Sequence, residues 1–233
     1  MKTILAWHWS DGPKCRYDDR PIVPGQTLIY EGAEPIELCK RGLHASTKIL
    51  DALKFAPGTT ISRVRLSGEI LRGTDKIVAT HRETIWSFDA EYILISWAAD
   101  CAERALLRER KAGREPAEAC FAAVEAARRF VKEPSEENRR AAYAVSCAAW
   151  AARNAAWAAS YAVYAAGSAA SAARYAAYAA DYAANAASDA ASAARNTAEV
   201  EGKDETAAYE SERKWQSARL RNLIAGGRHH NSK

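Results

Sequence analysis

The sequence lacks the features that mark disulfide-stabilised, secreted or membrane-spanning proteins. Its cysteines are odd in number and scattered along the chain: Cys15, Cys39, Cys101, Cys120 and Cys147. Because no Cys-x-x-Cys pair occurs among them, they predict reduced, buried thiols rather than a disulfide framework. No apolar run reaches about 18 residues, and His8 interrupts the short apolar stretch at the N-terminus. We therefore expect a cytoplasmic protein of the host cell, with neither a signal peptide nor a membrane contact.

Charge of one sign is not concentrated anywhere along the chain. The formal net charge is +4, and residues 1–95, 96–140, 141–196 and 197–233 each carry one more basic than acidic side chain. A nucleic-acid-binding protein usually gathers Lys and Arg on one face or in one tail. We therefore do not expect a nucleic-acid partner.

The first 95 residues have the composition of a small mixed domain. They contain five of the seven prolines and most of the β-branched residues. Residues 26–32, 59–71 and 76–88 predict strands bounded by Gly, Pro and Asp. Residues 46–56 predict a short helix, with Ser46 as its N-cap and Pro57 at its end. Residues 1–95 are therefore expected to form an α+β head domain.

From about residue 96 the sequence predicts only helices. Residues 96–113, 116–133 and 204–224 are amphipathic, and Ser135 is placed to cap a further helix. Gly226 and Gly227 are expected to end the last helix and to leave residues 226–233 as a disordered tail. The expected fold class is α+β: a small mixed N-terminal domain followed by an all-α, alanine-rich heptad-repeat domain over residues 96–225.

Residues 141–196 divide into eight consecutive heptads. The first and fourth places are always Ala, and the second and fifth are Ala except at Val163 and Val145. These four places cover one face of a helix, so two such faces can approach closely, as in a coiled coil. A continuous rod and a hairpin that turns at Gly167 both fit the pattern. The alanine face is also a candidate surface for self-association.

Aromatic residues occupy the opposite face of the heptads. They either pack on other helices of the same domain or form an exposed ladder for a partner protein, since Tyr and Trp dominate interface hot spots. Under the second interpretation the partner-binding residues are Trp150, Trp157, Tyr164 and Tyr178.

Three histidines fall in the first half of the chain. His8, His44 and His81 are separated by 36 and 37 residues, which matches no local metal-binding motif. We therefore expect no metal site. His8, His44 and Ser46 are instead the candidate ligand-binding residues of the head domain.

Two resemblances accompany these patterns. Residues 38–80, from "LCKRGLHAS" to "DKIVAT", resemble an N-terminal domain of uncharacterised phage and prophage proteins, over roughly residues 1–95. The motifs Cys101–Arg104, Glu125–Arg128 and Trp215-Gln216, together with the alanine heptads, resemble an all-helical immunity-protein group of bacterial toxin loci and phage genomes. This second resemblance covers roughly residues 96–225 and implies a binding protein without catalysis.

A third resemblance concerns the order of motifs in the head domain. The segments "AWHWS", "GLHASTKILDALKFA", "RVRLSGEI" and "AEYILI" follow the order of motifs in ADP-ribosyltransferases. The resemblance implies NAD as cofactor, with His8 and His44 around the nicotinamide and Glu91 stabilising the developing cation. Trp9 stands where that family has glycine.

The sequence therefore predicts a phage- or prophage-encoded, non-catalytic binding protein with a possible setting in immunity or counter-defence. Its partner would be a host or phage protein or a small nucleotide-like ligand, and no cofactor is expected. One alternative is an ADP-ribosyltransferase-like enzyme that uses NAD through His8, His44 and Glu91. The other is a structural, virion-associated helical protein.

Overall fold

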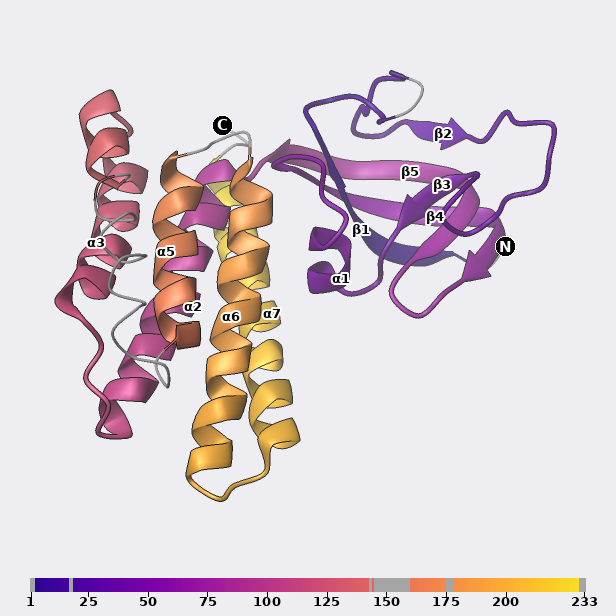
Figure 1. Ribbon diagram of the computed structural model, residues 1–233. Helices are drawn as coiled ribbons and strands as arrows, with labels where there is room; N and C mark the ends of the chain where they lie inside the picture. Colours follow the sequence, from indigo (N-terminus) through magenta and orange to yellow (C-terminus); the bar gives the residue numbers. More distant parts are fainter. Residues whose placement is uncertain (1–2, 17–18, 143, 145–159, 175–177, 231–233) are drawn as a thin grey trace. The chain divides into compact units, whose positions relative to one another are not determined.

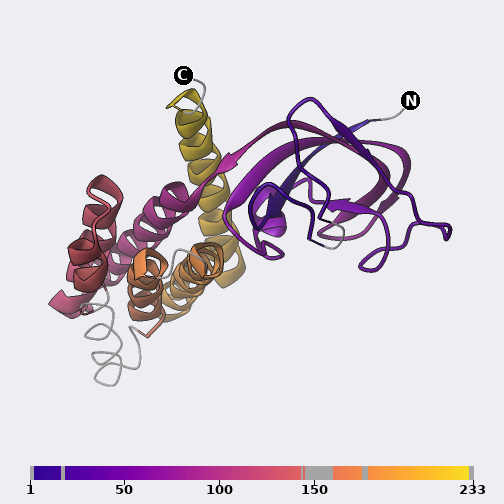
Figure 2. The same cartoon turned by 90° about the horizontal axis from the view of Figure 1, so that it is seen from above.

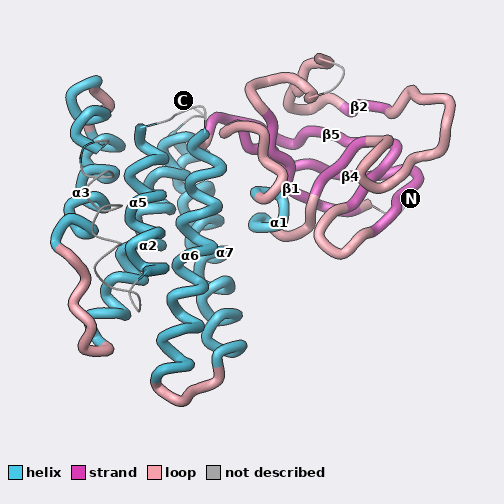
Figure 3. The backbone as a smooth tube through the Cα atoms, viewed as in Figure 1, coloured by secondary structure: helices cyan, strands magenta, loops and turns pink. Residues whose placement is uncertain are grey.

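The computed structural model describes residues 3–16, 19–142, 144, 160–174 and 178–230 (Figure 1). The chain divides into two compact units, Met1–Ala90 and Glu91–His230. The secondary-structure colouring of Figure 3 shows strands in the first unit and helices in the second. The two units are described separately below.

The first unit is built on an antiparallel sheet. Its elements are β1 (Ile4–Ser10), β2 (Thr27–Ile29), β3 (Leu43–Ala45), α1 (Ile49–Leu53), β4 (Thr60–Arg72) and β5 (Ile77–Asp89). The five strands follow the order β1-β4-β5-β2, and β3 also pairs with β5. Apolar residues of four strands, among them Ala6, Ala45, Val64 and Ala79, form a core on one face of this sheet. The long β4–β5 hairpin thus positions all the other strands.

The second unit is a bundle of helices. Its elements are α2 (Glu91–Lys111), α3 (Glu118–Lys132), α5 (Ser160–Arg174), α6 (Ala179–Val200) and α7 (Glu205–His230). Among these named helices α2 contacts all the others, and α5 lies against α6 (Figures 1 and 2). None of the helices in the described ranges is both long enough and apolar enough to cross a membrane.

The predicted alanine face is buried in α5 and α6. Alanines at the first, second, fourth and fifth heptad places are nearly inaccessible to solvent, among them Ala165, Ala169, Ala183, Ala187 and Ala190. Alanine lacks bulk, so neighbouring helices come close, and repetition along the seam compensates for the small area that each residue buries.

The fold class expected from the sequence is wrong. The chain is mixed, with 53% helix and 22% strand, and its N-terminal unit is an antiparallel five-stranded sheet rather than a small α+β domain. Its one described helix is only five residues long, and Lys48 rather than Ser46 occupies the N-cap position. The backbone of Ser46 instead exchanges two hydrogen bonds with Trp7 and so continues the sheet. The helical character of the later residues agrees broadly with the expectation.

Three glycines of the helical unit also behave differently from the prediction. Helix α5 passes through Gly167 without a break and lies against α6, so neither the rod nor the hairpin at Gly167 is found. Helix α7 continues through Gly226 and Gly227 to His230. A Cβ atom on Gly227 would lie 2.5 Å from Cδ1 of Ile93, so this glycine permits a close approach of α2 and α7 instead of ending a helix.

Candidate functional site

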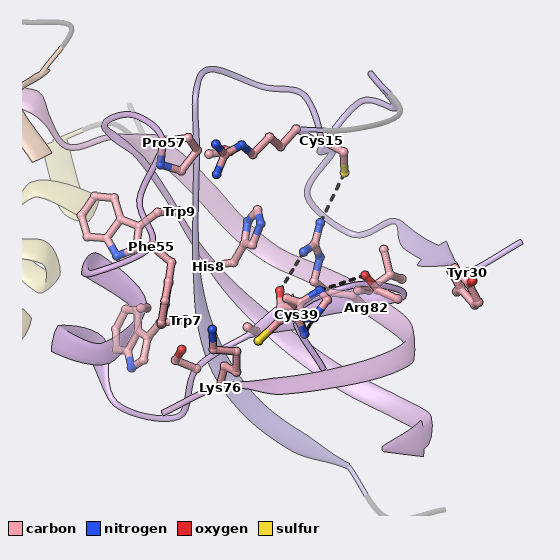
Figure 4. Close-up of a pocket in the computed structure, with 18 of the residues that line it drawn as sticks. Trp7, His8, Trp9, Cys15, Tyr30, Cys39, Phe55, Pro57, Lys76 and Arg82 are labelled. Carbon is pink, nitrogen blue, oxygen red and sulfur yellow. Dashed lines mark hydrogen bonds between the residues drawn. The ribbon is translucent and has the colours of Figure 1, made fainter. Parts of the chain in front are cut away.

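The first unit contains a cavity of about 480 Å³ (Figure 4). Four consecutive residues of β1 line it, and the segment Cys39–Ser46, which runs into β3, lines it from another direction. The end of α1 contributes Phe55, and β5 contributes Arg82. The sheet pairing of Trp7 with Ser46 holds β1 and the 39–46 segment together, so the cavity depends on contacts between distant parts of the sequence.

The lining of the cavity is strongly basic. It includes six cationic side chains: Arg16, Arg20, Lys40, Arg41, Lys76 and Arg82. Among the described residues that line the cavity there is no Asp or Glu. A cavity that is lined by cations and has walls of low dielectric constant concentrates positive electrostatic potential in its interior.

Glutamates next to the cavity neutralise part of this charge. Arg20 pairs with Glu31, Lys40 with Glu37, and Arg41 with Glu34 and Glu37. These glutamate side chains are exposed, so each ion pair stabilises little and an anion can compete for the cation. Lys76 has no acidic partner in the part of the chain that the structure describes, and its charge is therefore available to a ligand.

Arg82 lies at the inner end of this cluster. It is buried, with only 4% of its surface exposed, in the middle of β5. Its Nη1 donates a hydrogen bond to the carbonyl of His44 at 2.9 Å, and its Nη2 donates to the sulfur of Cys15 at 3.3 Å. Arg82 thus joins β3 and the Cys15 segment to β5, and it presents a desolvated positive charge to the cavity.

His44 has a structural task at the cavity wall. Its Nε2 accepts the backbone N–H of Cys39 at 3.0 Å, so its other nitrogen, Nδ1, carries the proton and donates to the carbonyl of Gly42 at 3.1 Å. Burial lowers the pKa of His44, and Lys76 and Arg82 lower it further against the opposing effect of the Gly42 carbonyl. The neutral ring therefore holds the loop that carries Lys40 and Arg41.

Gly42 permits this tight loop. It has φ +109°, and a Cβ atom there would lie 2.5 Å from Cγ2 of Val78. Any other residue would be strained and would collide with β5. Cys39, at the other end of the loop, also has a positive φ of 67° and is exposed.

His8 lies between the tryptophans of β1 and Arg82 in the view of Figure 4. Its Nδ1 atom is buried and has no hydrogen-bond partner among the described residues. Burial lowers the pKa of His8 well below its usual value, and the nearby Arg82 and His44 lower it further. The Nε1 of Trp9 is a second buried polar atom without a described partner. Since such atoms cost free energy when unpaired, they are available for a ligand.

Aromatic side chains complete the cavity wall. The ammonium of Lys76 lies 3.8 Å from the ring centroid of Phe55, whose side chain is 45% exposed. Trp7 is covered on one side by the guanidinium of Arg63, 4.4 Å from its ring centroid, and also lines the cavity. The site therefore combines cations, neutral imidazoles and aromatic rings.

The structure brings together the three ligand-binding residues predicted from the sequence. His8, His44 and Ser46 all line the cavity, although Ser46 is only 2% exposed. Glu91 does not line it, because Glu91 is the first residue of α2 and belongs to the second unit. His81 also lies outside the lining, and its Nδ1 is 2.9 Å from the hydroxyl of Thr80. No cluster of potential metal ligands occurs in the described ranges.

Sequence reasoning missed the basic residues of the cavity. Arg82 carried a signal, since a charged residue in the middle of a predicted strand of a central hairpin needs a buried partner. Lys76 carried none, because its position beside Phe55 depends on how α1 packs.

The residues predicted to bind a partner protein are less informative. Trp150 and Trp157 lie outside the described residues. Tyr164 is half-buried, with its ring centroid 6.3 Å from that of Tyr161, and Tyr178 is 59% exposed.

The motifs of the helical half form contacts between helices. Arg104 lies over the ring of Trp215 at 4.6 Å and binds the buried carboxylate of Glu212 at 2.8 Å, which joins α2 to α7. Arg128 binds Glu103 at 2.7 Å and so joins α3 to α2. These residues therefore position helices.

Comparison with known proteins identifies the helical half. Residues 93–215, more than half of the chain, match the model of a family of unknown function, DUF6931. No curated protein and no solved structure matches the chain significantly. The matched segment lies in the second unit, whereas the residues that line the cavity lie between positions 7 and 82. On this match, the chain belongs to the DUF6931 family, a family of unknown function.

Proposed function

We propose that the first unit is a binding module for a small anionic molecule, held in the cavity between β1, the 39–46 segment and β5. The basic lining of the cavity, without a carboxylate among its described residues, carries this proposal. The volume of about 480 Å³ falls within the range of small-molecule sites.

The arrangement favours an anion over a neutral or cationic ligand. Arg82 is buried and Lys76 has no described acidic partner, so both present charge that water screens poorly. An anion would form charge-assisted hydrogen bonds with them, which are stronger than neutral ones. His8 would stay neutral beside these cations, and its Nδ1, which has no partner among the described residues, would supply a hydrogen-bonding group.

The same lining favours binding over group transfer. The transferase alternative needs a carboxylate to stabilise a developing cation, and the residue predicted for that task, Glu91, is not among the lining residues. A basic cavity would destabilise such a cation.

A setting in phage biology, immunity or counter-defence, in the bacterial cytoplasm, is a further proposal that rests on the resemblances of the two halves alone.

A calorimetric titration of the full chain tests the proposal. The ligands are pyrophosphate, ribose 5-phosphate and AMP, with uncharged adenosine and ribose as controls. We expect saturable binding of at least one phosphorylated compound and tighter binding than that of its uncharged counterpart. Lys76→Gln should weaken this binding about tenfold or more, since a hydrogen bond to a charged group contributes about 1.5–3 kcal/mol.

Lys54→Gln is the matched control, because Lys54 lies outside the cavity lining and its ammonium is 3.4 Å from the carboxylate of Asp51. It should change the affinity about twofold at most. Equal losses in the two variants would contradict the assigned role of Lys76. If none of the phosphorylated compounds bound the folded chain, the proposal itself would be rejected.

A further inference from the structure

Lys76, which has no acidic partner among the described residues, lies next to an aromatic ring in the cavity. Lys76 Nζ is 3.8 Å from the ring centroid of Phe55, and both residues line the cavity. An anionic group bound to Lys76 would therefore lie beside the aromatic wall. A ligand that is only an anion would use the cation and leave the ring uncovered.

The aromatic residues of the cavity wall have surface that a ligand could cover. Phe55 follows the end of α1 and remains 45% exposed, although it is a large apolar side chain. Trp7 also lines the cavity, although Arg63 lies over its ring and the ring of Trp86 meets it edge to face at 6.0 Å between centroids. Planar heterocycles stack on such rings whatever their hydrogen-bonding pattern.

A buried donor lies in the same wall. Trp9 is 4% exposed, and its Nε1 has no hydrogen-bond partner among the described residues. An indole N–H can only donate, so it requires an acceptor such as a ring nitrogen or a ring carbonyl. A plain hydrocarbon ring has no such acceptor, whereas a nucleobase has several.

We propose that the ligand is a nucleoside phosphate, with its phosphate on Lys76 and its base against Phe55 and Trp7. This inference rests on the proposed binding of an anion in the same cavity. A phosphate and a base joined through a sugar satisfy the cation, the rings and the buried donor together. Inorganic phosphate or a sugar phosphate would satisfy the cation alone.

The test compares ligands that share the phosphate and differ in the base. The full chain is titrated with AMP, UMP, ribose 5-phosphate and inorganic phosphate. We expect AMP or UMP to bind at least about tenfold more tightly than ribose 5-phosphate, since stacking of one base contributes about 1–3 kcal/mol. Phe55→Ala should remove most of this advantage, because it should weaken the binding of AMP and UMP far more than that of ribose 5-phosphate.

Leu71→Ala is the control for loss of an exposed apolar side chain, because Leu71 is 37% exposed on β4 and does not line the cavity. It should alter neither affinity. If ribose 5-phosphate bound as tightly as both nucleotides, or if Phe55→Ala weakened all ligands equally, the base would not be recognised and this inference would be overturned. Anion binding at Lys76 would survive that result, whereas the absence of binding by every ligand would reject both proposals.

Discussion

His44 shows how a single side chain sets the shape of the cavity wall. Its ring accepts one backbone hydrogen bond and donates another within the segment from Cys39 to His44, and the accepted one depends on the neutral form. Protonation would place a second N–H against the N–H of Cys39. The side chain that looked like a ligand-binding residue in the sequence therefore acts first as a support for Lys40 and Arg41.

The two cavity histidines predict the dependence of stability on pH. Burial lowers the pKa of both His8 and His44 below the ordinary value of 6.5. Below about pH 6.5 the unfolded chain takes up protons that the folded chain does not, so the free energy of unfolding falls as the pH falls through the lowered folded pKa values. His44→Ala should cost about 1–2 kcal/mol at pH 7 and should flatten this decline.

Chemical denaturation of both proteins between pH 8 and pH 5 measures the effect. A His44→Ala variant with the same pH slope as the parent chain would contradict the assigned neutral role of His44. Because the variant also loses support of the loop, it is a poor control for ligand binding.

Asp189 predicts the opposite pH dependence in the helical unit. Burial raises its pKa from 3.8 to about 6. At pH 7 the carboxyl is ionised, and its buried surroundings then destabilise the folded protein. Asp189→Asn should stabilise the protein at pH 7 by about 1 kcal/mol. The gain is modest because the side chain is partly exposed and water screens its charge. The gain should vanish below about pH 4, where the carboxyl is protonated in both states. Thermal unfolding at the two pH values measures it, and a gain that persisted at low pH would require another cause.

At the scale of elements, the buried alanine face predicts at which positions a larger side chain destabilises the bundle. Ala190 is fully buried in α6, whereas Ser188, two residues earlier, is exposed on the same helix. Ala190→Leu should therefore destabilise the bundle by about 1–3 kcal/mol through overpacking. Ser188→Leu should change its stability by about 0.5 kcal/mol or less. Urea unfolding of the two variants gives the comparison, and equal stabilities would mean that the seam is not closely packed.

The sequence predicted the elements whose signal is local and missed those that depend on distant partners. The alanine face followed from a period within one helix. The strand Ile4–Ser10 did not, because its pairing partner begins about 50 residues later in β4. The length of the short helix was overestimated for a similar reason, because the backbone of Ser46 forms hydrogen bonds with the backbone of Trp7. Packing against Ile93 likewise lets α7 continue through Gly227.

The candidate site shows the same division between local and distant information. His8, His44 and Ser46 could be selected from the sequence because the histidines cluster in the head domain and fall in the motifs of the third resemblance. The basic character of the cavity could not, since its six cations come from separate segments and the net charge of residues 1–95 is nearly balanced. Charge that is even along a chain can therefore be uneven around one cavity.

At the scale of the whole molecule, the two units separate what is known of the chain from what is proposed for it. The family match falls in the helical unit, and the cavity falls in the sheet unit. Each unit has its own core: apolar residues of the strands in the first, and alanines together with larger side chains such as Trp97 and Phe130 in the second. The binding proposal therefore concerns this chain and does not extend to the family.

Separate cores predict that the units fold independently. Residues 1–90 and residues 91–233, expressed apart, should each unfold cooperatively, and the circular dichroism of the second should be strongly helical. The 1–90 fragment should keep the affinity of the full chain for any phosphorylated ligand to within about threefold, because every residue that lines the cavity belongs to it. Calorimetry on the fragments and the full chain makes the comparison. A folded 1–90 fragment that lost the binding shown by the full chain would mean that the helical unit contributes to the site, and the cavity would then have to be reassigned as a shared one.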